Sequence, residues 1–125
     1  MSIATWWLVF TGVALNAGAQ LFLKAATAVT GPIAFSWSAL GAAAPRLLSH
    51  YGWWAGLTCY GASVVIWVIA LSRAPVSIIY PMLSLGYILN AVAAMVLFDE
   101  PLSASKVAGI LIIVLGVYVL TQSRA

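Results

Sequence analysis

Acidic side chains are almost absent from this chain. Its 125 residues contain two carboxylates, the neighbours Asp99 and Glu100, and a single histidine, His50. General acid–base catalysis needs several titratable groups in one site, and a metal centre needs several ligands close together. We therefore expect no enzyme activity, no bound metal and no cofactor.

Cysteine and clustered basic residues are also scarce. Cys59 is the only cysteine, so an internal disulfide is excluded. The five cations are scattered along the chain, whereas nucleic-acid binding requires cations clustered on one face. The first sixteen residues contain no Lys or Arg, so the basic region of a secretory signal peptide is missing. We expect the first apolar stretch to be a retained membrane span.

Apolar residues dominate what is present. The chain is 65% hydrophobic and 6% charged, with a mean hydropathy of +1.13, whereas about 25% of residues are charged in a typical soluble domain. Four stretches approach the ~20 residues that a membrane helix needs. The sequence predicts an all-α polytopic membrane protein with one four-span domain, the spans covering about 3–24, 53–72, 76–98 and 104–121.

The connection between the first two spans has a different pattern. Apolar residues recur at helical spacing from Ile33 and Trp37 through Leu40 to Leu48, and Pro32 suits the first turn of a helix. With Pro45 and Arg46 inside it, this stretch is short for a span. The pattern predicts an interfacial helix over about 32–49, lying on the membrane surface. An extended entry to the second span is the alternative.

Loop charges leave the orientation in the membrane open. Arg73 and Arg124 would lie on one side, and Lys24, Arg46 and Lys106 on the other. Such a chain could insert both ways and pair with an inverted copy. Four spans are also few for enclosing a substrate path, so we expect a dimer, with a homodimer favoured over pairing with a paralogue.

The first span contains a polar row at i, i+4 and i+8. Asn16, Gln20 and Lys24 lie on one helical face, and lipid cannot satisfy their amide and ammonium groups. One interpretation is a polar pocket in which Lys24 meets an anionic group, because lysine is a good point-charge ligand for phosphate. The other is that the amides join helices by hydrogen bonds while Lys24 extends to the interface.

A second polar row lies in the third span. Tyr80, Ser84 and Tyr87 follow at i, i+4 and i+7. Pro81 cannot donate a backbone hydrogen bond, so the helix should kink there, and Gly86 adds a deformable place. We predict that Pro81 and Gly86 form a hinge next to a substrate-binding row. A packing kink with interfacial tyrosines is the alternative.

The fourth span contains small residues seven positions apart. Gly109 and Gly116 lie on one stripe, and small residues let two helices approach closely in lipid. This stripe predicts a dimer interface rather than a binding site.

Together these residues resemble the small multidrug resistance branch of the drug/metabolite transporter superfamily. The matching segments are GAQLFLK (18–24), YPMLSL (80–85) and FDEPL (98–102), set in four short spans. The sequence around Tyr80 is most similar to that of the subunits that flip aminoarabinose linked to undecaprenyl phosphate. The resemblance covers nearly the whole chain except 25–52, which is longer than the usual first connection of the family.

One departure from the family is informative. The resemblance implies that proton-coupled drug exporters carry a glutamate midway along the first span, and alignment on Lys24 puts Asn16 at that place. Asparagine can neither release a proton nor neutralise a cation, so cation–proton exchange is disfavoured.

The resemblance therefore implies a flippase-like transporter of the bacterial inner membrane that moves a polyprenyl-phosphate-linked sugar of the aminoarabinose type. Its substrate-binding residues would be Asn16, Gln20, Lys24, Tyr80, Ser84 and Tyr87. Two alternatives remain at this point: an exporter of drugs or metabolites, and a non-transporting helper subunit of a larger membrane assembly.

Overall fold

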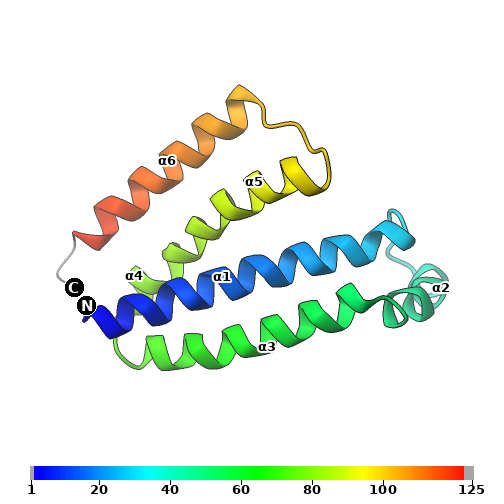
Figure 1. Cartoon of the computed structure of the whole chain (residues 1–125), viewed down its shortest axis with the longest axis horizontal. Coiled ribbons are helices and arrows are strands. Elements are labelled where there is room, and N and C mark those ends of the chain that lie inside the picture. The colour runs from blue at the N-terminus through cyan, green and yellow to red at the C-terminus, as the bar shows by residue number, and fades with distance from the viewer. Residues whose placement is uncertain (1, 123–125) are drawn as a thin grey trace.

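A computed structural model describes residues 2–122, and every regular element in this range is a helix (Figure 1). Four helical segments are long and apolar enough to cross a membrane. This confirms the all-α, four-span prediction. The segments are α1 (Ile3–Ala26, continued by the 3₁₀ turn η1, Thr27–Val29), α3 (Tyr51–Leu71), the composite segment α4–η2–α5 (Val76–Ile79, Tyr80–Leu85 and Gly86–Leu97) and α6 (Ala104–Thr121). Arg124, which entered the charge balance, lies outside the described residues.

Four of the helices, α3 and α6 among them, begin where a side chain caps the first turn. The α3 helix begins at Tyr51, slightly earlier than expected, because Nδ1 of His50 accepts a hydrogen bond from the backbone N–H of Gly52 at 2.9 Å. The α6 helix begins after Ser103, whose hydroxyl oxygen accepts from the backbone N–H of Lys106 at 3.2 Å. Such contacts satisfy backbone donors that the first helical turn leaves free.

Helices α1 and α3 pack antiparallel along their length (Figure 1). Glycines make this packing close. A Cβ atom on Gly52 would lie 2.6 Å from the carbonyl oxygen of Phe22, and one on Gly12 would lie 3.0 Å from the ring of Trp67. Gly56 lies in the same contact. Small residues therefore allow the two backbones to approach, as is common between helices in lipid.

The third span is not one regular helix. A four-residue helix, α4, passes into the 3₁₀ segment η2 around Pro81 before α5 begins at Gly86. Gly86 is buried against α1, where an added Cβ would lie 3.5 Å from Val13 and 3.7 Å from Ala17. Its φ of −63° is open to any residue, so its position reflects packing. The break lies where the sequence predicts a kink, and motion about it stays a prediction.

The buried core lies at one end of the bundle, near the start of α1. Its members are Val9, Val13, Ala70, Ile78, Ile79, Met82 and Val117. Val117 is the only buried residue that α6 contributes, and α6 diverges from α1 and α3 (Figure 1). An added Cβ on Gly109 or Gly116 would meet nothing within 4 Å. Most of α6 is therefore unpacked within this chain, and its role in a dimer stays a prediction.

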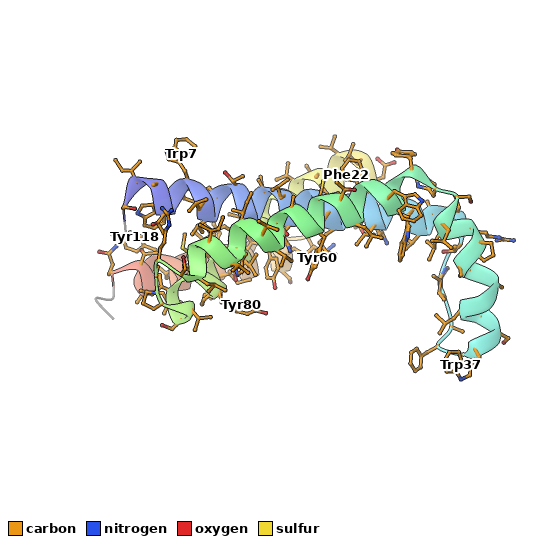
Figure 2. All side chains as sticks on the ribbon, turned by 90° about the horizontal axis from the view of Figure 1, so that it is seen from below. Trp7, Phe22, Trp37, Tyr60, Tyr80 and Tyr118 are labelled. Carbon is orange, nitrogen blue, oxygen red and sulfur yellow. The ribbon has the colours of Figure 1, made fainter. Side chains whose placement is uncertain are left out.

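The connection between α1 and α3 contains α2 (Trp37–Leu48), inside the range expected for an interfacial helix. It projects away from the long axis of the bundle, with Trp37 near its far end (Figure 2). Ala43 is its one buried residue, whereas the apolar stripe is uncovered and Trp37 is 92% exposed. The stripe thus faces away from the rest of the chain. Its contact with a membrane surface stays a prediction.

Candidate functional site

A polar groove runs between α1 and the η2–α5 segment. It consists of three neighbouring hollows, which we name inner, middle and mouth. The inner and middle hollows share Asn16, Tyr80 and Leu83. The middle and mouth hollows share Gln20, Tyr87 and Asn90. Because consecutive hollows share lining residues, they lie next to one another along α1, and we refer to the three together as the groove.

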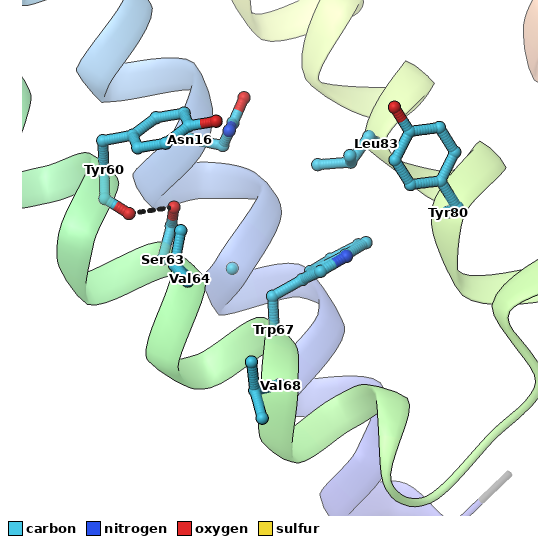
Figure 3. A pocket seen from close by; sticks show the side chains of 9 residues that line it. Asn16, Tyr60, Ser63, Val64, Trp67, Val68, Tyr80 and Leu83 are labelled. Carbon is cyan, nitrogen blue, oxygen red and sulfur yellow. Dashed lines mark hydrogen bonds between the residues drawn. The ribbon is translucent and has the colours of Figure 1, made fainter.

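The inner hollow is the smallest of the three, at about 210 Å³. Asn16 and Tyr60 approach it from α1 and α3, whereas Tyr80 lies across from them on the η2 side (Figure 3). Trp67 lies along its wall (Figure 3). The hydroxyl of Ser63 donates to the carbonyl of Tyr60 at 2.7 Å and is occupied by its own helix. The amide of Asn16, the phenols of Tyr60 and Tyr80 and the indole N–H of Trp67 are the other polar groups here.

The middle hollow, about 450 Å³, brings the two predicted polar rows together. Asn16 and Gln20 line it from α1, and Tyr80, Ser84 and Tyr87 line it from the third span. Both predicted hinge residues, Pro81 and Gly86, also border it. The break in the third span therefore forms part of the groove wall. A change in its geometry would change the width of the groove.

The mouth hollow, also about 450 Å³, contains the charged groups of the groove. Lys24, Glu100 and Lys106 line it, together with Gln20 and Asn90. Lys24 also borders a larger hollow of about 640 Å³, which is lined by the start of the α1–α2 connection. Lys24 thus lies where the groove opens toward the end of the bundle.

All six predicted substrate-binding residues therefore line the groove, whereas Gly109 and Gly116 lie away from it on α6. Four further residues line the groove that were not predicted from the sequence: Tyr60, Asn90, Glu100 and Lys106. Asn90 lies three positions after Tyr87 and so continues the row of Tyr80, Ser84 and Tyr87. This spacing could have identified it. The other three belong to elements whose placement depends on the tertiary fold.

The charges in the groove are unevenly distributed. The part lined by Asn16, Tyr80 and Ser84 contains no ionisable carboxylate or amine, and both cations and the one carboxylate lie at the mouth. Oδ1 of Asn90 is the one buried side-chain oxygen or nitrogen within residues 2–122 that has no hydrogen-bond partner. The groove can thus solvate a polar, uncharged or anionic group but offers no carboxylate along the span to neutralise a cation.

Comparison with known proteins identifies relatives of this chain. The chain is 51% identical over 73 residues to a probable 4-amino-4-deoxy-L-arabinose-phosphoundecaprenol flippase subunit ArnF of Shewanella sediminis, a match that spans 56% of this chain and 50% of that protein. It is 37% identical over 87 residues to the corresponding subunit ArnE of Pseudomonas aeruginosa, covering 62% of this chain and 76% of the relative. With ArnE of Escherichia fergusonii it shares 33% identity over 102 residues, which cover 80% of this chain and 92% of that protein.

No family model matches the chain, and no solved structure is similar to it. The pairwise matches nevertheless cover most of two ArnE subunits at more than 30% identity. They confirm the resemblance to aminoarabinose flippase subunits, which are named as transport proteins rather than enzymes. This multi-pass membrane protein belongs to the family of the ArnE and ArnF flippase subunits.

Proposed function

We propose that this chain is a subunit of a flippase that moves a polyprenyl-phosphate-linked sugar, of the 4-amino-4-deoxy-L-arabinose type, across the bacterial inner membrane. The observation that carries the proposal is the polar groove, which runs from Lys24 at its mouth to Asn16 inside the span. The ArnE and ArnF relatives, named as probable 4-amino-4-deoxy-L-arabinose-phosphoundecaprenol flippase subunits, support the same substrate class.

The groove suggests how the head group crosses. Lys24 attracts the lipid phosphate at the membrane surface, because an ammonium is a strong point-charge partner for phosphate. The amides of Asn16 and Gln20 and the hydroxyls of Tyr80, Ser84 and Tyr87 then replace water around the sugar. Hydrogen bonds matter most here because polar groups left unpaired in lipid are costly. The polyprenyl tail stays in the bilayer throughout.

The composition of the groove favours this function over cation export. An exporter that exchanges protons for cations needs a titratable acid beside its substrate, and Asn16 occupies the matching place. Within residues 2–122, Glu100 is the one carboxylate that lines the groove, and it lies at the mouth, which Lys24 and Lys106 also line. Flipping would therefore be passive, with its net direction set by consumption of the head group on the far side.

The working unit would be a dimer. The glycine stripe of Gly109 and Gly116 lies on a helix that is largely unpacked within this chain. A second copy or a paralogous subunit that packs on α6 would cover this face and help to enclose the groove. The amphipathic α2 would lie on the membrane surface, with Trp37 at the interface, where indole rings are favoured.

Reconstitution tests the proposal. Protein purified with any co-purifying subunit and placed in liposomes is expected to move a polyprenyl-phosphate aminosugar between leaflets at the same rate with and without a proton gradient. The measurement is accessibility of the head group to a membrane-impermeant amine reagent. Empty liposomes provide the control. A rate that depends strongly on the gradient would exclude passive flipping, and no movement above the control would exclude the function.

A further inference from the structure

The mouth hollow contains charges of both signs. Lys24 and Lys106 lie on its wall together with Glu100. Nζ of Lys106 donates a hydrogen bond to the carbonyl oxygen of Pro101 at 2.8 Å, which positions this ammonium at the loop before α6. Glu100 precedes Pro101 in the same loop. A site for a simple anion would gain nothing from a carboxylate, because like charges close together repel each other.

Asn90 provides an independent observation on the same hollow. Its Oδ1 is buried and has no hydrogen-bond partner, although the residue borders both the mouth and the middle hollows. A buried acceptor without a partner is costly, so native structures usually provide a donor for it. An amide oxygen accepts from hydroxyl or ammonium groups. A rotation of the Asn90 amide toward the hollows that the residue borders would bring this acceptor to a donor next to the charged mouth.

We propose that the mouth hollow recognises a zwitterionic head group, with Lys24 and Lys106 on the phosphate and Glu100 and Asn90 Oδ1 on the ammonium of the sugar. This inference rests on the proposed function and assigns the chemistry by which the same groove selects its lipid. An aminosugar joined to a polyprenyl phosphate carries one anion and one ammonium. The hollow offers cations for the first, and for the second a carboxylate and the unpartnered acceptor of Asn90 once its amide turns toward the hollow.

Charge pairing then explains selection against a neutral sugar. A hydroxyl in place of the ammonium could still donate to Asn90, but it would leave Glu100 without a cationic partner. Hydrogen bonds to charged groups contribute more than those between neutral groups. Glu100 would accordingly act as a specificity residue for the amine, whereas Lys24 would be needed for any polyprenyl-phosphate sugar.

Two lipids and three variants test this assignment. Flipping is measured for a polyprenyl-phosphate aminosugar and for the same lipid with a hydroxyl replacing the amine. Glu100→Gln is expected to slow the amino lipid about tenfold, the size of one charge-assisted hydrogen bond, and to leave the hydroxyl lipid unchanged. Asn90→Leu is expected to slow both lipids, because it removes the acceptor for either donor.

Asp99→Asn is the matched control, because Asp99 neighbours Glu100 but does not line the mouth hollow. Its φ of +54° is tolerated by asparagine, so this variant should fold and flip both lipids like the parent. Equal slowing of both lipids by Glu100→Gln, or equal rates for the two lipids in the parent protein, would overturn this inference but leave the proposed function standing. A parent protein that moves neither lipid would overturn the proposed function as well.

Discussion

Replacing Lys24 with alanine is expected to lower the flipping rate by roughly ten- to a hundredfold, the range given by the loss of one hydrogen bond to a charged group. Lys24 is the cation that α1 places at the groove mouth, and no other residue of α1 can bind phosphate by charge. Lys24→Arg keeps the positive charge and should retain flipping within about threefold of the parent. The measurement is the initial rate of head-group transfer in liposomes.

Arg46→Ala is the matched control for the loss of one positive charge. Arg46 lies in the last turn of α2, away from the hollows that form the groove. It should therefore change the flipping rate little. If Lys24→Ala and Lys24→Arg both flipped like the parent, Lys24 would have no role in phosphate binding and would only extend to the interface.

The second large effect is expected in the packing of α1 against α3, the two helices that form one wall of the groove. Gly52→Ala is expected to destabilise the protein by about 1–3 kcal/mol, because its new Cβ would lie 2.6 Å from the carbonyl oxygen of Phe22. A backbone atom cannot move aside without moving α1. Because folded proteins are stable by only about 5–15 kcal/mol, this should lower the thermal midpoint measured in detergent by several degrees.

Gly61→Ala is the corresponding control in the same helix. An added Cβ on Gly61 would meet nothing within 4 Å, and alanine favours helix by up to about 1 kcal/mol over glycine. Its midpoint should equal or exceed that of the parent. Equal midpoints for the two variants would mean that the close approach of α1 and α3 is not required for stability.

The polar groove could be predicted to a large extent because helical geometry alone determines which residues share a face. Asn16, Gln20 and Lys24 recur at four-residue intervals within α1, and Tyr80, Ser84 and Tyr87 follow at intervals of four and three. The second row was predicted on an α-helical period, whereas the structure shows a 3₁₀ segment over Tyr80–Leu85. Only the pairing of these two rows required the tertiary structure. The departure from regular helix near Pro81 also followed from local chemistry, since proline lacks a backbone donor.

Other features depend on contacts between elements and have no comparable local pattern. The close approach at Gly52 involves a carbonyl oxygen of α1, and glycine is common in membrane helices whether or not it packs. Glu100 and Lys106 reach the groove mouth because of the path of the loop between α5 and α6. Hydrophobic periodicity does not encode such a path.

Substrate passage through the groove is the central claim, and site-specific blocking tests it most directly. In a Cys59→Ser background, Ser84→Cys would put the only thiol in the middle hollow. Gly18→Cys would put it in an apolar hollow with Trp7 and Phe10, outside the groove. Each protein is reacted with a bulky thiol reagent before flipping is measured in liposomes.

Modification of the Ser84→Cys protein should reduce flipping to the level of empty liposomes, and an excess of lipid substrate should slow the modification. The Gly18→Cys protein should flip equally well before and after complete modification. If fully modified Ser84→Cys protein flipped as fast as the unmodified protein, the head group would not pass through this groove.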